Sequence, residues 1–277
     1  MPLARINGAS LYYEIEGEGQ PVLFIMGTGL AHTLWSPQIA AFKPKFKCIS
    51  YDNRGTGQSE LTAEGHTVAD YAEDACGLLN HLQISSAHVV GWSLGSCIAQ
   101  ELAIRYPDKV RSLVLIATWC RPYPFLRRRF ELQIEIAKTE NQNLLGEFSV
   151  LHLFRPDHLD DHDQEVLDFQ RRALEGPGRA PMETLIAHYR MDIAHDSADR
   201  LAAVKVPTLV LGGQDDVLVR APYQEEVHRR IAGSEISLIP KADHMAVVLI
   251  PEQINQIALE FLERHFAAKT RAQQRAS

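Results

Sequence analysis

Residues and segments that are typical of disulfide-rich and membrane proteins are scarce in this sequence. It has only four cysteines in 277 residues, and they form neither a Cys-x-x-Cys pair nor a dense framework. This scatter argues against a disulfide scaffold and predicts buried free thiols in a reducing compartment. No apolar stretch approaches the roughly 20 residues that a membrane span needs, and the first residues have no apolar signal-peptide core. We therefore expect a cytoplasmic protein.

Several common motifs are missing as well. We find no Walker A motif, no complete Gly-x-Gly-x-x-Gly and no His-Glu-x-x-His. There is no evident repeat and no low-complexity segment. Acidic residues outnumber basic ones, 35 to 28, which gives a formal net charge of −7. This balance argues against nucleic acid and anionic membranes as partners.

What the chain does have is a series of short apolar runs separated by helical patterns. Its 45% hydrophobic and 23% charged residues are typical of a globular protein. Apolar runs at 21–26, 46–51, 110–118 and 206–213 are typical of strands buried on both faces. Strands that alternate with helices predict crossover connections. The expected fold is therefore α/β, with a mostly parallel central sheet flanked by helices.

The alternation of strands and helices stops after Trp119. Residues 121–200 show helical periodicity and no convincing strand. Strands resume after this segment. The sequence therefore predicts an α/β core in two parts, 1–120 and 201–277, with an all-helical cap inserted at 121–200.

A serine stands between two glycines where a predicted strand gives way to a predicted helix. Residues 88–97 read HVVGWSLGSC. A Gly-x-Ser-x-Gly turn exposes the serine hydroxyl, and the N-terminus of the following helix offers free N–H groups and a positive dipole end. Ser93 is therefore a candidate nucleophile, and the N–H of Leu94 is a candidate oxyanion donor. The alternative interpretation is a plain tight turn.

Two other strand ends supply candidate partners for this serine. His244 lies in a loop between a predicted strand and the last helix, from which it can reach the edge of the sheet that carries the serine turn. Asp215 and Asp216 directly follow another apolar run, and Asp216 is the favoured acid. In the order Ser93, Asp216, His244, the aspartate would orient the histidine, and the histidine would take the serine proton.

With these motifs in place, the sequence resembles the α/β-hydrolase superfamily over nearly its whole length. The segments at 91–96, 51–59, 207–216 and 242–245 resemble its nucleophile elbow, the loop after its fourth strand, its acid strand and its histidine loop. The family spacing also favours Asp216. The chain is most similar to the branch of small esterases and enol-lactonases with a helical cap.

One stretch departs from the family pattern. The oxyanion strand of the family usually ends in His-Gly, whereas this one ends in Met26-Gly27-Thr28-Gly29. The resemblance places the second oxyanion donor at the backbone N–H of Thr28. Methionine at position 26 removes a polar anchor of the loop. We therefore expect the oxyanion hole to remain and the shape of its wall to differ.

Large side chains near the expected site are candidates for a substrate pocket. Trp119 ends a strand at the catalytic edge, and Trp92 flanks the serine. The full set of pocket candidates is Met26, Trp92, Trp119, Phe125, Phe148, Phe154, Tyr189 and Met245. His158 and His162 are four residues apart, a spacing that can bind zinc on a helix. A solvated polar turn on the cap is the favoured interpretation, and no metal is predicted.

These features predict a serine hydrolase that cleaves a carboxylic ester or lactone through an acyl-enzyme. No cofactor is expected, the partner is a small-molecule ester or lactone, and the protein would be a monomer or homodimer. The same triad could instead serve carbon–carbon bond hydrolysis, perhydrolysis, or cofactor-free lyase or oxygenase chemistry. An alternative from another class is a small-molecule receptor on this fold with little turnover.

Overall fold

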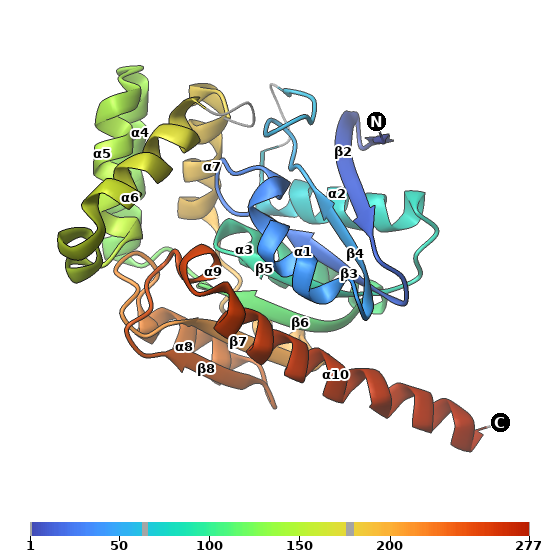
Figure 1. Cartoon of the computed structure of the whole chain (residues 1–277). Coiled ribbons are helices and arrows are strands. Elements are labelled where there is room, and N and C mark those ends of the chain that lie inside the picture. Colours follow the sequence, from blue (N-terminus) through green and yellow to red (C-terminus); the bar gives the residue numbers. More distant parts are fainter. Residues whose placement is uncertain (1, 63–65, 176–179, 277) are drawn as a thin grey trace.

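A computed structural model describes residues 2–62, 66–175 and 180–276, with the side chains of 173–175 and of 266 onward outside the description. Across these residues, eight strands form one sheet in the order β1-β2-β4-β3-β5-β6-β7-β8 (Figure 1). The strands are β1 (Leu3–Ile6), β2 (Ala9–Glu16), β3 (Gln20–Ile25), β4 (Phe46–Tyr51), β5 (Ala87–Trp92), β6 (Val110–Ile116), β7 (Thr208–Gly213) and β8 (Glu235–Ile239).

The sheet is antiparallel at one edge and parallel elsewhere. β1 and β2 form a hairpin, and Asn7 and Gly8 at its turn both have positive φ, 45° and 83°. This is the conformation that an Asn-Gly turn favours. β2 is antiparallel to β4, and all further pairings, from β4–β3 to β7–β8, are parallel. The prediction of a mostly parallel α/β sheet is confirmed.

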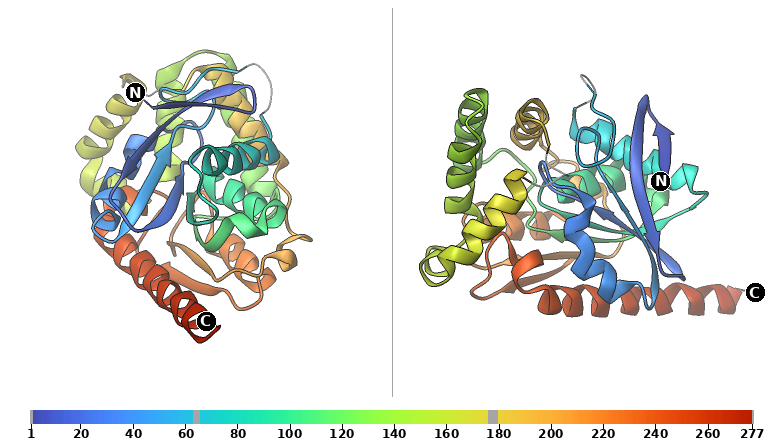
Figure 2. Two further views of the ribbon diagram at one scale, coloured as in Figure 1. Left: turned by 90° about the vertical axis from the view of Figure 1, so that its right-hand side faces the viewer. Right: turned by 45° about the horizontal axis from the view of Figure 1, so that its top comes forward.

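Helices cover both faces of this sheet. Every residue of β5 and of β7 is buried, as expected for strands covered on both sides. α1 packs with α10 on one face, and α2, α3 and α8 lie on the other (Figure 2). These helices are α1 (Ser36–Phe42), α2 (Val68–His81), α3 (Leu94–Arg105), α8 (Ala221–Arg230) and α10 (Pro251–Ala276), with a short α9 (Ala246–Leu249) before the last one.

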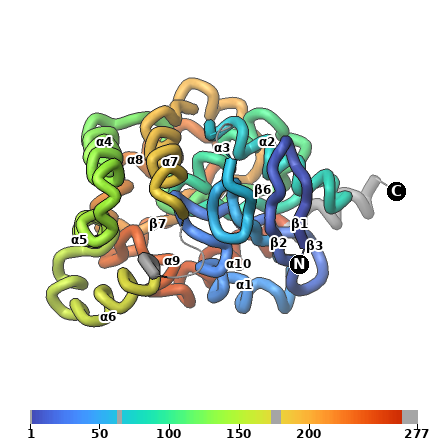
Figure 3. The backbone as a smooth tube through the Cα atoms, turned by 90° about the horizontal axis from the view of Figure 1, so that it is seen from above, coloured from blue at the N-terminus to red at the C-terminus, as the bar shows by residue number. Residues whose placement is uncertain are grey.

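In the described residues between β6 and β7, four helices form a separate group, which we call the cap helices. They are α4 (Pro124–Lys138), α5 (Gln142–Leu153), α6 (Pro156–Glu175) and α7 (Met182–Ala194). Figures 1 and 3 show them together beside the sheet, with α4 next to α7. They occupy the stretch from which the sequence predicts an inserted helical cap.

The start of α6 corrects one prediction. The residues around His158 and His162 are helical, and not a polar turn, because α6 already begins at Pro156. Proline at the first helical position and Asp157 in the first turn both favour a helix start there. His162 has non-helical angles and marks a kink within α6. Among the described residues, no group of histidine, cysteine and acidic side chains could hold a metal ion.

The four cysteines are buried and free, as the sequence predicts. Burial raises the pKa of the Cys48 thiol to about 12 and that of Cys120 to about 11. Such thiols are poor nucleophiles at neutral pH because the thiolate is scarce. In the described part of the chain, no helix has the length and apolar character to cross a membrane.

Candidate active site

The serine turn has a strained backbone. Ser93 lies between β5 and α3 with φ 56° and ψ −124°, a conformation that non-glycine residues rarely adopt. Such outliers cost about 1–3 kcal/mol and are concentrated at functional sites. The Ser93 N–H donates to the Ile116 carbonyl at 2.9 Å, and the Ser93 carbonyl accepts from the Ser96 N–H at 2.8 Å. The turn is thus held by both the sheet and the first turn of α3.

The two glycines of the motif allow close packing of backbone on backbone. A Cβ on Gly91 would lie 2.3 Å from the carbonyl oxygen of Gly95. A Cβ on Gly95 would lie 2.1 Å from the carbonyl oxygen of Ile25. Neither oxygen can move without shifting the main chain. The glycines therefore let the N-terminus of α3 approach β3 and β5, which places Ser93 at the sheet edge.

The acid and the histidine meet from two other loops. The Nδ1–H of His244 donates to Oδ2 of Asp216 at 2.9 Å, and both side chains are buried. Oδ1 of the same carboxylate accepts two backbone N–H groups, from Leu218 at 2.8 Å and Val219 at 2.7 Å. The carboxylate is therefore fixed in orientation. With its hydrogen on Nδ1, the imidazole keeps the Nε2 lone pair available to accept a proton.

The neighbouring acid, Asp215, does not contact the histidine. It lies at the surface, where its Oδ2 accepts the backbone N–H of Lys241 at 3.0 Å. Of the two acids that the sequence leaves open, the geometry pairs Asp216 with His244.

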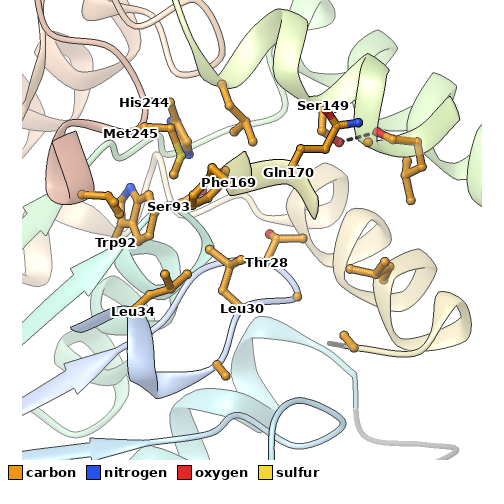
Figure 4. A pocket seen from close by; sticks show the side chains of 18 of the residues that line it. Thr28, Leu30, Leu34, Trp92, Ser93, Ser149, Phe169, Gln170, His244 and Met245 are labelled. Atoms are coloured by element: carbon orange, nitrogen blue, oxygen red, sulfur yellow. Dashed lines mark hydrogen bonds between the residues drawn. The ribbon is translucent and has the colours of Figure 1, made fainter. Parts of the chain in front are cut away.

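Ser93 and His244 line the same cavity, which has a volume of about 820 Å³ (Figure 4). The cavity lies between the sheet edge and the cap helices, and its exposed surface is mainly apolar. The Trp92 ring lies beside His244, with ring centroids 5.9 Å apart. Leu30 and Leu34 lie across the cavity from His244 in Figure 4.

Four of the predicted pocket residues line this cavity: Trp92, Phe154, Tyr189 and Met245. Leucine and phenylalanine side chains that the sequence did not single out complete much of the wall; they include Leu30, Leu34, Phe130, Leu145, Leu153 and Phe169. On α4 and α5 these residues follow the ordinary apolar spacing of a packed helix. That spacing does not distinguish a cavity wall from a core.

The other four predicted pocket residues lie elsewhere. Met26 is fully buried in the core, and Trp119 is fully buried behind Phe130, with ring centroids 6.3 Å apart. Phe130 lines the cavity in its place. Phe125 is 44% exposed at the outer surface, and Phe148 packs on His152. Trp119 follows β6 at the edge of the sheet that carries Ser93, as expected. However, Phe130 of α4 packs against its ring, and Trp119 does not reach the cavity.

The loop after β3 lies directly against the serine. A Cβ on Gly27 would be 3.1 Å from the Ser93 Cβ, and Thr28 lines the cavity. Leu94 is the first residue of α3, where backbone N–H groups have no partner within the helix. Of the two candidate oxyanion donors, Leu94 thus follows Ser93 in the chain, and Thr28 follows the glycine that packs against Ser93.

The arrangement of the sheet and of the three loops is that of a known kind of enzyme fold. A parallel sheet that carries a serine turn, an acid loop and a histidine loop at one edge is the architecture of an α/β hydrolase. A family model described as alpha/beta hydrolase fold matches residues 20–249. The chain belongs to this family, as the motifs predict.

Several proteins similar to this chain are named as hydrolases. A protein named as carbamate hydrolase RutD from Azorhizobium caulinodans is 30% identical over 262 residues, which cover 94% of this chain and 98% of that protein. A thermophilic esterase from Thermogutta terrifontis has a TM-score of 0.85 and 28% identity, with 96% and 99% of the two chains covered. The enol-lactonase of Burkholderia xenovorans shares the fold, with a TM-score of 0.85 at 24% identity, over 95% of this chain and all of that one.

Proposed function

We propose that this protein is a serine hydrolase that cleaves a carboxylic ester or lactone through an acyl-enzyme. Ser93 Oγ attacks the carbonyl carbon while His244 Nε2 takes its proton. The tetrahedral intermediate then collapses, the carbonyl–oxygen bond breaks, and His244 returns the proton to the leaving alcohol. Water, deprotonated by the same histidine, attacks the acyl-serine and releases the acid and the free serine.

One observation carries this proposal: the bond between Asp216 and His244 Nδ1. This 2.9 Å bond holds the imidazole in the tautomer that a general base needs, with Nε2 unprotonated. The buried carboxylate also stabilises the imidazolium that forms in the transition state. A histidine with only a structural role would not require a carboxylate held by two further N–H donors.

The negative charge of the tetrahedral intermediate needs donors on the side opposite the base. We assign this role to the N–H groups of Thr28, on the cavity wall, and of Leu94, at the start of α3. Backbone donors of this kind are preorganised, and the loss of one oxyanion-hole donor costs on the order of 10²–10³ in rate.

The cavity favours a substrate of moderate size with an apolar part. A volume of about 820 Å³ lies in the range of sites for drug-sized ligands, and its surface is mainly apolar. A simple carbamate would fill only a small part of it. We therefore propose an ester or lactone with an apolar acyl or ring portion, and we treat the carbamate named for the relatives as the competing substrate.

A substrate panel tests the proposal. Wild type and Ser93→Ala are assayed with p-nitrophenyl esters of increasing chain length, small lactones and alkyl carbamates, and with peroxide plus a carboxylic acid. We expect multiple turnover of esters or lactones by wild type and none by the variant. Turnover of carbamates alone, peracid formation without ester cleavage, or stoichiometric binding without turnover would overturn it.

A further inference from the structure

The loop that carries the Thr28 donor is tied to the cap through two hydrogen bonds. The Thr28 hydroxyl donates to Oδ2 of Asp192 at 2.8 Å, and the Gly29 N–H donates to Nδ1 of His188 at 3.0 Å. Asp192 and His188 are four residues apart on α7, so they lie on one face of that helix. This face of the cap therefore contacts the loop next to the serine.

Asp192 is an unusual residue for the interior of the cap. It is fully buried, and burial raises its pKa to about 8, so the carboxyl is largely protonated at neutral pH. Its Oδ2 accepts the Thr28 hydroxyl, while Oδ1 has no hydrogen-bond partner among the described residues. A buried carboxyl with so few partners destabilises a fold. The packing of α7 alone gives no reason to place an acid there.

His188 is held in one orientation from the core side. Burial lowers its pKa to about 3, so the ring is neutral, and its acceptor role at Nδ1 places the hydrogen on Nε2. Nε2–H donates to the Tyr71 hydroxyl at 2.8 Å, and that hydroxyl donates to the Arg54 carbonyl at 3.1 Å. His188 Nδ1, the acceptor for the Gly29 N–H, is thus fixed in place by hydrogen bonds through Tyr71 to the backbone of Arg54.

The same loop is shaped to fit α7. Gly29 has φ 68°, and a Cβ there would lie 2.2 Å from Leu185 Cδ2 on α7. On the core side, the Met26 carbonyl accepts from Asn53 Nδ2 at 3.1 Å, but the Met26 side chain offers no polar anchor. The side-chain acceptors that reach Thr28 and Gly29 thus come from α7.

We propose that Asp192 and His188 are positioning residues that hold the Thr28 N–H in line with the oxyanion, so that the cap completes the catalytic site and does more than limit substrate size. This inference rests on the proposed hydrolase function. Its consequence is that a change on α7, outside the cavity wall, reduces transition-state stabilisation while it leaves substrate binding largely intact.

The test compares Asp192→Leu with Asp192→Asn. Leucine is similar in size and cannot accept the Thr28 hydroxyl, whereas asparagine is neutral and keeps an acceptor oxygen. We expect Asp192→Leu to lower kcat about 10- to 100-fold at nearly unchanged KM, a part of the cost of losing a donor. Affinity for an alkyl boronic acid, which forms a tetrahedral adduct on serine, should fall by a similar factor. Asp192→Asn should recover most of both.

The matched control is Thr184→Val, a buried polar-to-apolar change on the same helix. It should leave kcat and boronate affinity near wild type. His188→Gln, which keeps a side-chain acceptor, and His188→Leu, which does not, repeat the comparison if Asp192→Leu fails to fold.

Two results would overturn the inference. One is normal kcat and boronate affinity in the leucine variants; the other is an equal loss in the variants that retain an acceptor. Ser93→Ala separates the two proposals, because ester turnover by that variant overturns the hydrolase function itself. Loss of turnover in Ser93→Ala together with full activity in Asp192→Leu overturns only the positioning role.

Discussion

Asp216→Asn is a nearly isosteric change whose effect can be worked out from the contacts of one carboxylate. In the native protein, Oδ1 accepts two N–H groups, from Leu218 and Val219, and Oδ2 accepts from His244. In the variant, the amide oxygen must remain at the Oδ1 position because an NH₂ there would face two donors. The NH₂ group therefore points at His244 Nδ1.

An NH₂ donor at this position inverts the tautomer of the histidine. Nδ1 has to accept, so the hydrogen moves to Nε2, and Nε2 can no longer take the Ser93 proton. The imidazolium that forms in the transition state also loses its counter-charge. For a change of this kind in a serine triad, the expected loss in kcat is on the order of 10⁴-fold, or about 5 kcal/mol in activation free energy.

The assay is the steady-state rate of ester hydrolysis, with Asp215→Asn as the matched control. Asp215 is adjacent in sequence, but it lies at the surface, where its side chain accepts the backbone N–H of Lys241. Its change to asparagine should alter kcat by less than about threefold, since surface changes away from such contacts have small effects. Asp216 does not have this role if Asp216→Asn retains a tenth or more of wild-type kcat, or if the two variants lose activity equally.

Three further predictions concern the cavity, the cap and the core. Leu145→Trp adds bulk to the apolar wall, so turnover of long-chain p-nitrophenyl esters should fall at least tenfold while acetate turnover persists; equal loss for both would contradict the cavity assignment. Because burial raises the pKa of Asp192 to about 8, the folded state keeps a proton that the unfolded state releases above about pH 4. The free energy of unfolding should therefore decline between about pH 4 and 8 relative to Asp192→Asn, as measured by urea unfolding; parallel curves would contradict it. Asp74→Ala removes the partner of the buried Arg54 guanidinium and should cost about 3–5 kcal/mol of unfolding free energy. A loss below about 1 kcal/mol would show that Arg54 finds another partner.

The fold can be predicted from the sequence because the patterns that specify its strands and turns are local. Continuous apolar runs such as β3 and β7, and the Asn7-Gly8 turn, specify strands and a hairpin without long-range information. The positions of Ser93, Asp216 and His244 also follow from local context, because each comes after a strand of a parallel sheet. The carboxyl ends of such strands meet at one edge.

The cap could be predicted as helical but not in its packing. Whether an apolar residue on α4 or α5 faces the cavity or the core depends on how the helices sit on the sheet. This is why Phe130 lines the cavity and Trp119 lies behind it. The anchoring of the loop that carries Thr28 depends on the same packing. The Thr28–Asp192 bond joins residues 164 positions apart, and no spacing along the chain indicates it.

The proposed function requires that Ser93 is a nucleophile activated at this site. The most direct measurement is intact-mass analysis after treatment with a fluorophosphonate, followed by peptide mapping. We expect one adduct per chain in wild type, located on Ser93, and none in Ser93→Ala at the same dose. An unlabelled wild type, or an adduct that persists in Ser93→Ala, would contradict it.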